Sequence, residues 1–241
     1  MSNSSYNTYR EWKNWNNSSK IPDWLGRYFE KELGVASPEP MKSVLEIGFG
    51  NGEFLRWAKS QGMEVAGAEI IPELVDALKK DGFDVALWDA SVGDNSGCPW
   101  AAEKFDCIIL FDVIEHLTLD QATQALNNLA ALLHPGGRII CRFPNGESPV
   151  SSLIFNNDFT HQTLFTARKL EHLCLETPLE LVRYGNSARV VNMSVLFPFK
   201  WLCFLLRDLC EILFGYIYYG HRVPLDQCAT AVFRLKGSAN N

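Results

Sequence analysis

Apolar and polar positions follow two rhythms along the chain, one typical of amphipathic helices and one typical of buried strands. Between residues 42 and 144, short apolar runs are separated by stretches with apolar residues three or four positions apart. The runs expected to be strands are SVLEIGF, MEVAGAEI, FDVALWDA, FDCIILFDVI and RIICRFP. Strands that alternate with helices in units of this length predict an α/β fold with a doubly wound, mostly parallel sheet.

The rhythm changes on both sides of this region. Residues 1–40 are expected to form an N-terminal arm and a cap helix, because IPDWLGRYFEKEL has apolar residues at helical spacing. After Pro144 we expect a loop, NGESPVSSLIFNNDFTHQT, and then a helix, TARKLEHLCLE, with Thr166 as its N-cap. LELVRYG and CATAVFRL add two strands, so residues 41–236 are predicted to form one domain with a seven-stranded sheet.

Charge and cysteine usage narrow the class of protein. The net charge is −6 and the longest basic run is Lys79-Lys80, which argues against nucleic acid as the main partner. The seven cysteines include no Cys-x-x-Cys pair, so neither a disulfide framework nor a zinc site is expected, and a cytoplasmic location is favoured. The polar N-terminus lacks the apolar region of a signal peptide.

A run of glycines, Gly48, Gly50 and Gly52, follows the first expected strand and opens a helix. Glycine lets the backbone approach a ligand closely, at the sheet edge where ligands of α/β proteins bind. A dinucleotide fingerprint needs a third glycine where this chain has Glu53, and a carboxylate there would repel a pyrophosphate. The pattern that begins at Glu46 therefore points to a different cofactor, although a tight turn without a ligand could also use these glycines.

This pattern resembles motif I of the class I S-adenosylmethionine-dependent methyltransferases. Four later segments, VAGAEI, LWDAS, FDCIILFDVIEHL and LLHPGGRIICRFPN, resemble further motifs of that family, so the resemblance covers about residues 42–145. It implies S-adenosylmethionine as the cofactor, with Glu46 and the glycines at its amino-acid part and Glu69 accepting hydrogen bonds from both ribose hydroxyls. The further cofactor contacts that it implies are Ile70, Asp89, Ala90, Phe111 and Asp112.

The resemblance divides the domain into a cofactor half, 41–145, and an acceptor-site half, 146–236, which contains an apolar insertion over 193–222. Arg142 and Asn145, at the boundary, are expected to contact the acceptor. Asp89 has an alternative role as a helix cap without any ligand.

A hydroxyl acceptor calls for a base, because a protonated hydroxyl is a poor nucleophile. NNDFTHQTLFT places Asp158 and His161 in one loop, where the acid can hold the imidazole in one tautomer. His116 is a further candidate base. Alternatively, Asp158 caps a turn, His161 bonds to backbone, and Asp112 and His116 organise a loop. Asp158 and His161 alone are too few ligands for a metal, so none is expected.

The run Asp158-Phe159-Thr160-His161, followed by Phe165-Thr166, resembles a subgroup of bacterial methyltransferases of surface-polysaccharide and lipopolysaccharide biosynthesis. This resemblance implies O-methylation of a sugar hydroxyl in a glycan or glycan precursor. The alternatives are a methyltransferase for another small molecule, such as a polyketide, quinone or amine, and a non-catalytic protein that binds the cofactor.

The segment 195–220 is the most apolar of the chain, but Lys200, Arg207, Asp208 and Glu211 interrupt it within roughly a 100° arc of a helix. It is therefore expected to be an amphipathic helix inserted before the last strand and not a transmembrane span. Three roles remain open: core or lid of the domain, surface of a homodimer, or peripheral contact with the inner face of a membrane.

Overall fold

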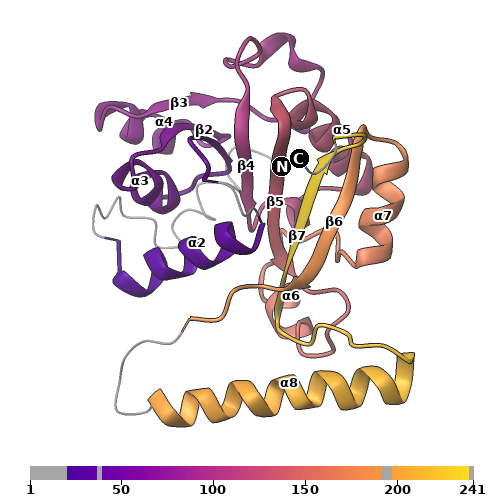
Figure 1. The fold of residues 1–241 in the computed structure, drawn as a ribbon. Helices are drawn as coiled ribbons and strands as arrows, with labels where there is room; N and C mark the ends of the chain where they lie inside the picture. The colour runs from indigo at the N-terminus through magenta and orange to yellow at the C-terminus, as the bar shows by residue number, and fades with distance from the viewer. Residues whose placement is uncertain (1–20, 37–39, 191–196, 239–241) are drawn as a thin grey trace.

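The computed structural model describes residues 21–36, 40–190 and 197–238. They form one mixed sheet with helices on both faces (Figure 1). The expected arm over 1–20 and the first residues of the insertion, 193–196, lie outside the described residues. The strands are β1 (Ser43–Ile47), β2 (Glu64–Glu69), β3 (Asp84–Leu87), β4 (Phe105–Phe111), β5 (Leu133–Pro144), β6 (Leu179–Asn186) and β7 (Cys228–Leu235). The α-helices are α2 (Asp23–Ala36), α3 (Glu53–Ser60), α4 (Pro72–Lys80), α5 (Leu119–Ala130), α6 (Ser152–Asn157), α7 (Ala167–Leu175) and α8 (Phe197–Tyr219).

The strand order is β3-β2-β1-β4-β5-β7-β6, and β7 runs antiparallel to both of its neighbours. The order reverses between β1 and β4, which places a crevice at the carboxyl ends of these two strands. The predicted fold, a mostly parallel sheet of seven strands, is confirmed. The turn that holds Gly48, Gly50 and Gly52 opens at this crevice.

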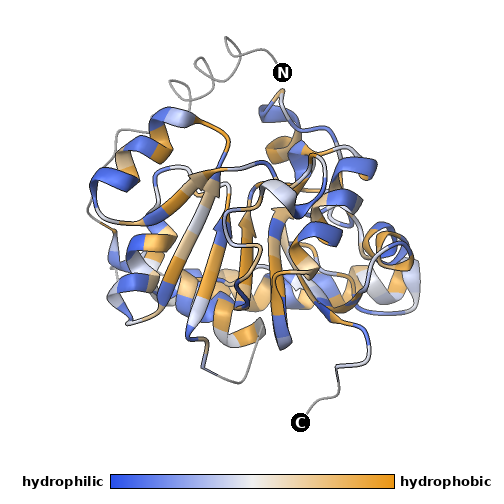
Figure 2. Ribbon diagram, turned by 90° about the horizontal axis from the view of Figure 1, so that it is seen from above, coloured by the Kyte–Doolittle hydropathy of each residue, from blue (hydrophilic) through white to orange (hydrophobic). Residues whose placement is uncertain are grey.

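Alternating residues of the buried strands face two layers of helices (Figure 2). Val44, Cys107 and Ile109 pack with apolar side chains of α2 and α3. Leu45, Ile108 and Leu110 point to the other face and pack with α5 and α7. Because both faces are covered, these strands are apolar along most of their length and not only at every second residue.

One buried carboxylate of α2 ties this helix to the far end of the sheet. Glu32 Oε1 accepts hydrogen bonds from Tyr28 Oη, Ser187 Oγ, Ala188 N and Thr230 Oγ1. On its apolar side, α2 stacks Phe29 against Phe111 of β4, with 5.9 Å between the ring centroids. The cap helix therefore lies over the carboxyl end of β4, next to the crevice.

The acceptor half differs from the sequence prediction in two places. Residues 145–163 were expected to be loop, but they include the short helix α6. The expected helix in the insertion is present as α8, yet it does not pack its apolar side on the sheet. Leu205, Leu209 and Leu213 are each more than half exposed, whereas Glu211 is fully buried. Of the roles left open for this segment, packing into the core is therefore wrong, because the helix turns its charged side inward.

Within the described part of the chain, no helix is both long and apolar enough to cross a membrane. The predicted N-cap of α7 is confirmed, because Thr166 Oγ1 accepts a hydrogen bond from Lys169 N.

Packing around β2 can be tested at Gly67. A Cβ at Gly67 would lie 2.7 Å from Leu55 Cδ1 and 2.9 Å from Phe49 Cδ1. Overpacking of this kind costs about 1–3 kcal/mol, so we expect Gly67→Ala to lower the free energy of unfolding by that amount in urea titrations.

The matched control is Gly34→Ala on α2, where no atom lies within 4 Å of the new methyl group. It should leave stability unchanged or raise it slightly, because alanine favours helix over glycine. Equal free energies for the two variants would contradict the tight packing at Gly67.

Candidate functional site

The turn after β1 depends on glycine for its backbone path. Gly48, Gly50 and Gly52 all have positive φ angles, between 50° and 70°. A side chain at two of them would also collide with the core, since a Cβ at Gly48 would lie 2.6 Å from Val113 Cγ2 and one at Gly52 2.5 Å from Leu78 Cδ2. The glycines therefore keep the turn tight and close to Val113, which follows β4, and to Leu78 of α4.

The carboxylate of Glu69, at the end of β2, binds this turn directly. Glu69 Oε2 accepts a hydrogen bond from Gly50 N at 3.0 Å, and Oε1 accepts from Ile70 N at 2.7 Å and Ile71 N at 3.2 Å. Burial raises the pKa of Glu69, and these three backbone bonds oppose the rise. The site thus holds an oriented acid whose charge is only partly compensated by backbone dipoles.

A second acid, Glu46, lies at the base of the same turn. It is almost fully buried, and its Oε2 has no hydrogen-bond partner. Burial raises the pKa of Glu46 well above its ordinary value, and the nearby charges of Glu69 and Glu53 raise it further. A buried acceptor without a donor is costly, so this position favours a ligand that carries a donor or a positive charge.

These residues line a cavity of about 450 Å³ at the crevice. Of the predicted cofactor contacts, nine line it: Glu46, Gly48, Gly50, Glu69, Ile70, Asp89, Ala90, Phe111 and Asp112. Gly52 is not among the lining residues and acts on the shape of the turn instead. Sequence analysis missed several lining side chains, among them Phe29, Trp88, Gln121, Thr160 and Gln162. Trp88 could have been found, because it ends the third apolar run directly before Asp89.

Asp89 lies in a turn and caps no helix, so the alternative role expected for it is wrong. Its Oδ1 accepts hydrogen bonds from Ser91 N at 2.9 Å and Ser91 Oγ at 2.6 Å, which closes a turn after β3. The residue also lines the cavity.

Arg142 and Asn145 were predicted to contact the acceptor, and the structure separates them. Arg142 lines the cavity, pairs with the Asp112 carboxylate through Nε at 2.9 Å, and lies over the Phe111 ring. Asn145 is fully buried outside the cavity lining, donates to the carbonyl oxygens of Pro224 and Asp226, and accepts from Tyr184 Oη. Its amide is used up in holding loops together, so the expectation of a substrate contact does not fit this residue.

The two histidines also occupy different positions. His116 lines the cavity, whereas His161 and Asp158 do not. His161 Nδ1 donates to the Phe155 carbonyl oxygen at 2.9 Å, because a carbonyl can only accept. Its Nε2 lies 3.8 Å from both Glu115 Oε1 and Asp158 Oδ2, and the side chain is only 6% exposed. His161 is thus enclosed by two buried carboxylates behind the cavity wall.

Asp158 reaches the cavity indirectly, through Thr160 and His116. Thr160 Oγ1 donates to Asp158 Oδ1 and lies 2.8 Å from His116 Nδ1. The Thr160 hydroxyl has a single proton, which it donates in the hydrogen bond to Asp158. The Thr160 oxygen therefore accepts a hydrogen bond from His116 Nδ1. This chain of bonds gives neutral His116 its proton at Nδ1 and makes Nε2 the basic nitrogen.

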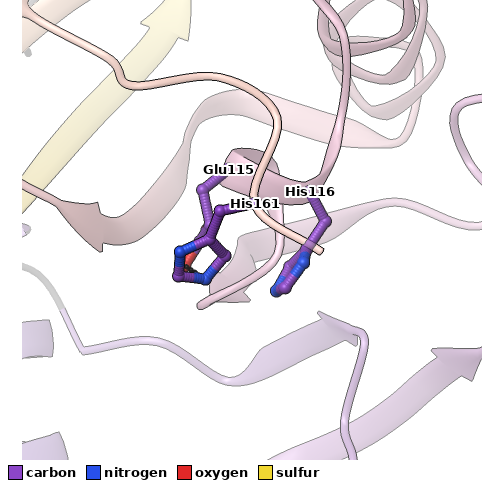
Figure 3. Close-up of side chains that lie close together, drawn as sticks. All are labelled: Glu115, His116 and His161. Carbon is purple, nitrogen blue, oxygen red and sulfur yellow. Dashed lines mark ion pairs between the residues drawn. The ribbon is translucent and has the colours of Figure 1, made fainter. Parts of the chain in front are cut away.

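Glu115, His116 and His161 converge from two elements (Figure 3). Their ligand atoms lie within 4.8 Å of one another, and they are a group in the described part of the chain that could hold a metal ion. The sequence pairs His161 only with Asp158, whereas the fold brings Glu115 and His116 to it, so the expectation that ligands are too few for a metal does not fit the structure. The close approach arises because Gln162 N and Thr163 N both donate to the Glu115 carbonyl oxygen.

A family model described as a methyltransferase domain matches residues 14–184, more than half of the chain. The chain belongs to this family. It is a methyltransferase domain of the S-adenosylmethionine-dependent class, as the sequence motifs predicted.

Among the relatives of this methyltransferase domain, one is named for a tRNA substrate and another is named without any substrate. Over 129 residues it is 30% identical to a tRNA N(3)-methylcytidine methyltransferase of Schizosaccharomyces pombe, and this match covers 49% of this chain and 42% of that protein. It is 29% identical over 113 residues to an uncharacterized methyltransferase of Geobacillus kaustophilus, covering 46% of this chain and 51% of that one. The chain thus spans about half the length, or less, of these curated relatives. A solved methyltransferase of Archaeoglobus fulgidus shares the fold, with a TM-score of 0.58, 17% identity, and coverage of 87% of this chain and 92% of that one.

The residues present fit S-adenosylmethionine. This cofactor carries a positive sulfonium and an ammonium group, and the cavity wall carries the buried acids Glu46 and Glu69 beside the glycine turn. The Glu46 oxygen that lacks a donor would gain one from an ammonium group. Glu69 retains acceptor capacity for hydroxyl groups besides its three backbone bonds.

The raised pKa of Glu46 predicts a pH-dependent effect of its removal. Above its folded-state pKa, the ionised carboxylate destabilises the folded chain, and this penalty disappears as pH falls toward the ordinary glutamate pKa of about 4.3. We expect cofactor-free Glu46→Gln to be more stable than the parent chain at about pH 8 and to lose that advantage toward about pH 5. Urea unfolding across this range measures the difference.

Glu64→Gln, at the exposed start of β2, is the control and should show no such trend. A stability difference for Glu46→Gln that is the same at every pH would contradict the prediction.

Proposed function

We propose that this domain transfers the methyl group of S-adenosylmethionine to a hydroxyl oxygen and that His116 Nε2 accepts the hydroxyl proton. The observation that carries the proposal is the hydrogen-bond chain from Asp158 through Thr160 to His116 Nδ1, at the wall of the cavity. A base is needed for a protonated hydroxyl and unnecessary for an acceptor that is already anionic.

In this mechanism the chain's own residues bind, orient and move one proton. The cofactor, when bound, supplies the methyl group and a positive sulfur. Thr160 and Asp158 orient the imidazole of His116 and stabilise it once Nε2 takes the proton, as a carboxylate does for a catalytic histidine. The aromatic residues Phe29 and Phe111, with Trp88, line the cavity and limit the access of water.

His161 takes a supporting role in the proposal. Its Nδ1 donates to the Phe155 carbonyl oxygen, and the backbone bonds of Gln162 and Thr163 to the Glu115 carbonyl oxygen hold the loop that carries Thr160 against Glu115 and His116. Gln162 Nε2 donates to the His116 carbonyl oxygen at 2.6 Å and joins the same two segments. We assign His161 to positioning and His116 to proton transfer.

For the acceptor we propose a saccharide hydroxyl in a bacterial glycan or glycan precursor. The support is the motif from Asp158 to His161, which resembles the polysaccharide-associated subgroup and contributes Thr160 to the cavity. A tRNA nucleoside is the second candidate, because a relative is named as a tRNA methyltransferase. The net charge of −6 disfavours it, since tRNA binding depends on clustered cations.

The acceptor class can be tested with methyl-labelled cofactor. We expect label to enter cell-envelope glycan fractions and lipid-linked or nucleotide-linked sugars, and to resist ribonuclease. Label that appears in total tRNA and is lost on ribonuclease treatment would show that the acceptor is a tRNA nucleoside and not a sugar. Label confined to aromatic or amine acceptors would reject both.

The base can be tested with His116→Ala. We expect turnover to fall about 100-fold or more, with cofactor affinity by calorimetry near that of the parent chain, because general bases contribute rate and not cofactor binding. Thr160→Val should lower turnover less and shift the acid limb of the pH–rate profile, because it removes only the group that orients His116.

His172→Ala, at an exposed position on α7, serves as the matched control and should keep full turnover. Full turnover in His116→Ala would overturn the assignment. Activity that is lost on chelation and restored by a divalent cation would assign Glu115, His116 and His161 to a metal instead.

A further inference from the structure

Helix α8 is attached to the domain by its charged side. Glu211, in the middle of the helix, is buried and accepts hydrogen bonds from Arg189 Nη2 at 2.9 Å and Arg222 Nη2 at 2.7 Å. Asp226 binds Arg189 as well, through Nε at 2.5 Å, and also pairs with Arg207. The partners Arg189, Arg222 and Asp226 come from the segments on either side of the helix, so a network of opposite charges fixes its orientation.

The other side of α8 is uncovered. Leu202, Leu205, Leu206, Leu209, Leu213 and Ile217 form what we call the apolar face, and each is between 50% and 72% exposed. At about 100° per residue, these six side chains fall within an arc of about 120° opposite Glu211, and none of the charged residues of α8 falls within that arc. A helix of 23 residues is about 34 Å long, and a contiguous apolar patch of a few hundred Å² on a protein surface is often a functional site.

We propose that the apolar face binds the surface of a lipid bilayer, with α8 lying in the plane of the membrane. Trp201 and Tyr219 lie near the edge of the face at its two ends and are 52% and 57% exposed. Rings with a polar tip suit the boundary between acyl chains and headgroups. A bilayer can also cover the whole width of the apolar face, because its acyl chains form a continuous apolar layer.

A second copy of the chain would fit this face less well. Helices that pair along a seam use a narrower apolar stripe, with charged residues close on both sides. If two copies of α8 paired in this way, the edges of the apolar face would stay in water.

The exposed charges of the network lie at the junction between α8 and the domain, on the side away from the apolar face. Arg207 and Arg222 keep 45% and 53% of their side chains exposed, whereas their partners Asp226 and Glu211 keep 9% and 1%. Asp208 is exposed to a similar degree, at 44%. None of these charges interrupts the apolar face.

The position of α8 gives the contact a consequence for the catalytic site. The loop after the helix packs at the end of β5, where Asn145 and Ser148 Oγ bond to the carbonyl oxygens of Pro224 and Leu225. Figure 1 shows α8 lying across this end of the sheet, apart from the layers that cover its faces. A bilayer on the apolar face would lie beyond the strand ends that open the cavity, and the domain would meet a lipid-anchored acceptor from that side.

The test is flotation of the full chain with vesicles, which separates lipid binding from aggregation because only vesicle-bound protein rises. We expect the parent chain to float both with phosphatidylcholine vesicles and with vesicles of an equal mixture of phosphatidylcholine and phosphatidylglycerol. The double variant Leu209→Glu, Leu213→Glu should partition at least about tenfold less, because two apolar contacts are replaced by charges. Leu175→Glu, at an exposed position on α7, should float like the parent chain.

Calorimetry with S-adenosylmethionine shows whether each variant is folded, and equal cofactor affinity in all three chains is expected. Failure of the parent chain to float with either vesicle would overturn the proposal, as would equal flotation of the double variant. A dimer in solution that the double variant converts to a monomer, without any flotation of the parent chain, would assign the face to a second copy. These readouts do not depend on the acceptor, so they fail or succeed separately from the proposed reaction.

Discussion

The carboxylate of Glu69 joins two turns of the sheet, and the site depends on that junction. Three backbone N–H groups, from Gly50, Ile70 and Ile71, bind its two oxygens. Gly50 can take part only because the turn after β1 has positive φ angles at its glycines, which a side chain would strain. The hydrogen bonds that shape the cavity therefore also place a buried negative charge in its wall.

The buried negative charge in the cavity wall determines which kind of cofactor suits the cofactor half. Two buried acids, Glu46 and Glu69, have raised pKa values and face the same cavity, which costs stability in the absence of a ligand. A cationic cofactor relieves this cost and so gains affinity from it. On the other side of the cavity, the buried Asp158 carboxylate acts through Thr160 to orient His116, the proposed base.

Helix α8 inverts the usual arrangement of an amphipathic helix. Buried ion pairs with Arg189 and Arg222 hold its charged side to the domain, and the leucines point away from it. Replacing Arg189 or Arg222 would remove one of the two cations that compensate buried Glu211, so the network is costly to break and keeps the helix in one orientation. An apolar surface held in this way resembles a binding surface more than a part of the core.

The sequence by itself determined the α/β fold, the order of its strands and most of the residues at the glycine turn that line the cavity, because apolar periodicity and glycine spacing are local properties of the chain. Only the tertiary structure decided which histidine faces the cavity. Thr160 and His116 are 44 positions apart, and their contact depends on how the loop packs. It also decided the direction of α8, since an amphipathic helix does not encode which face meets the protein. That choice follows from Arg189, Arg222 and Asp226, which lie outside the helix. The two arginines pair with its buried Glu211, and Asp226 pairs with its Arg207.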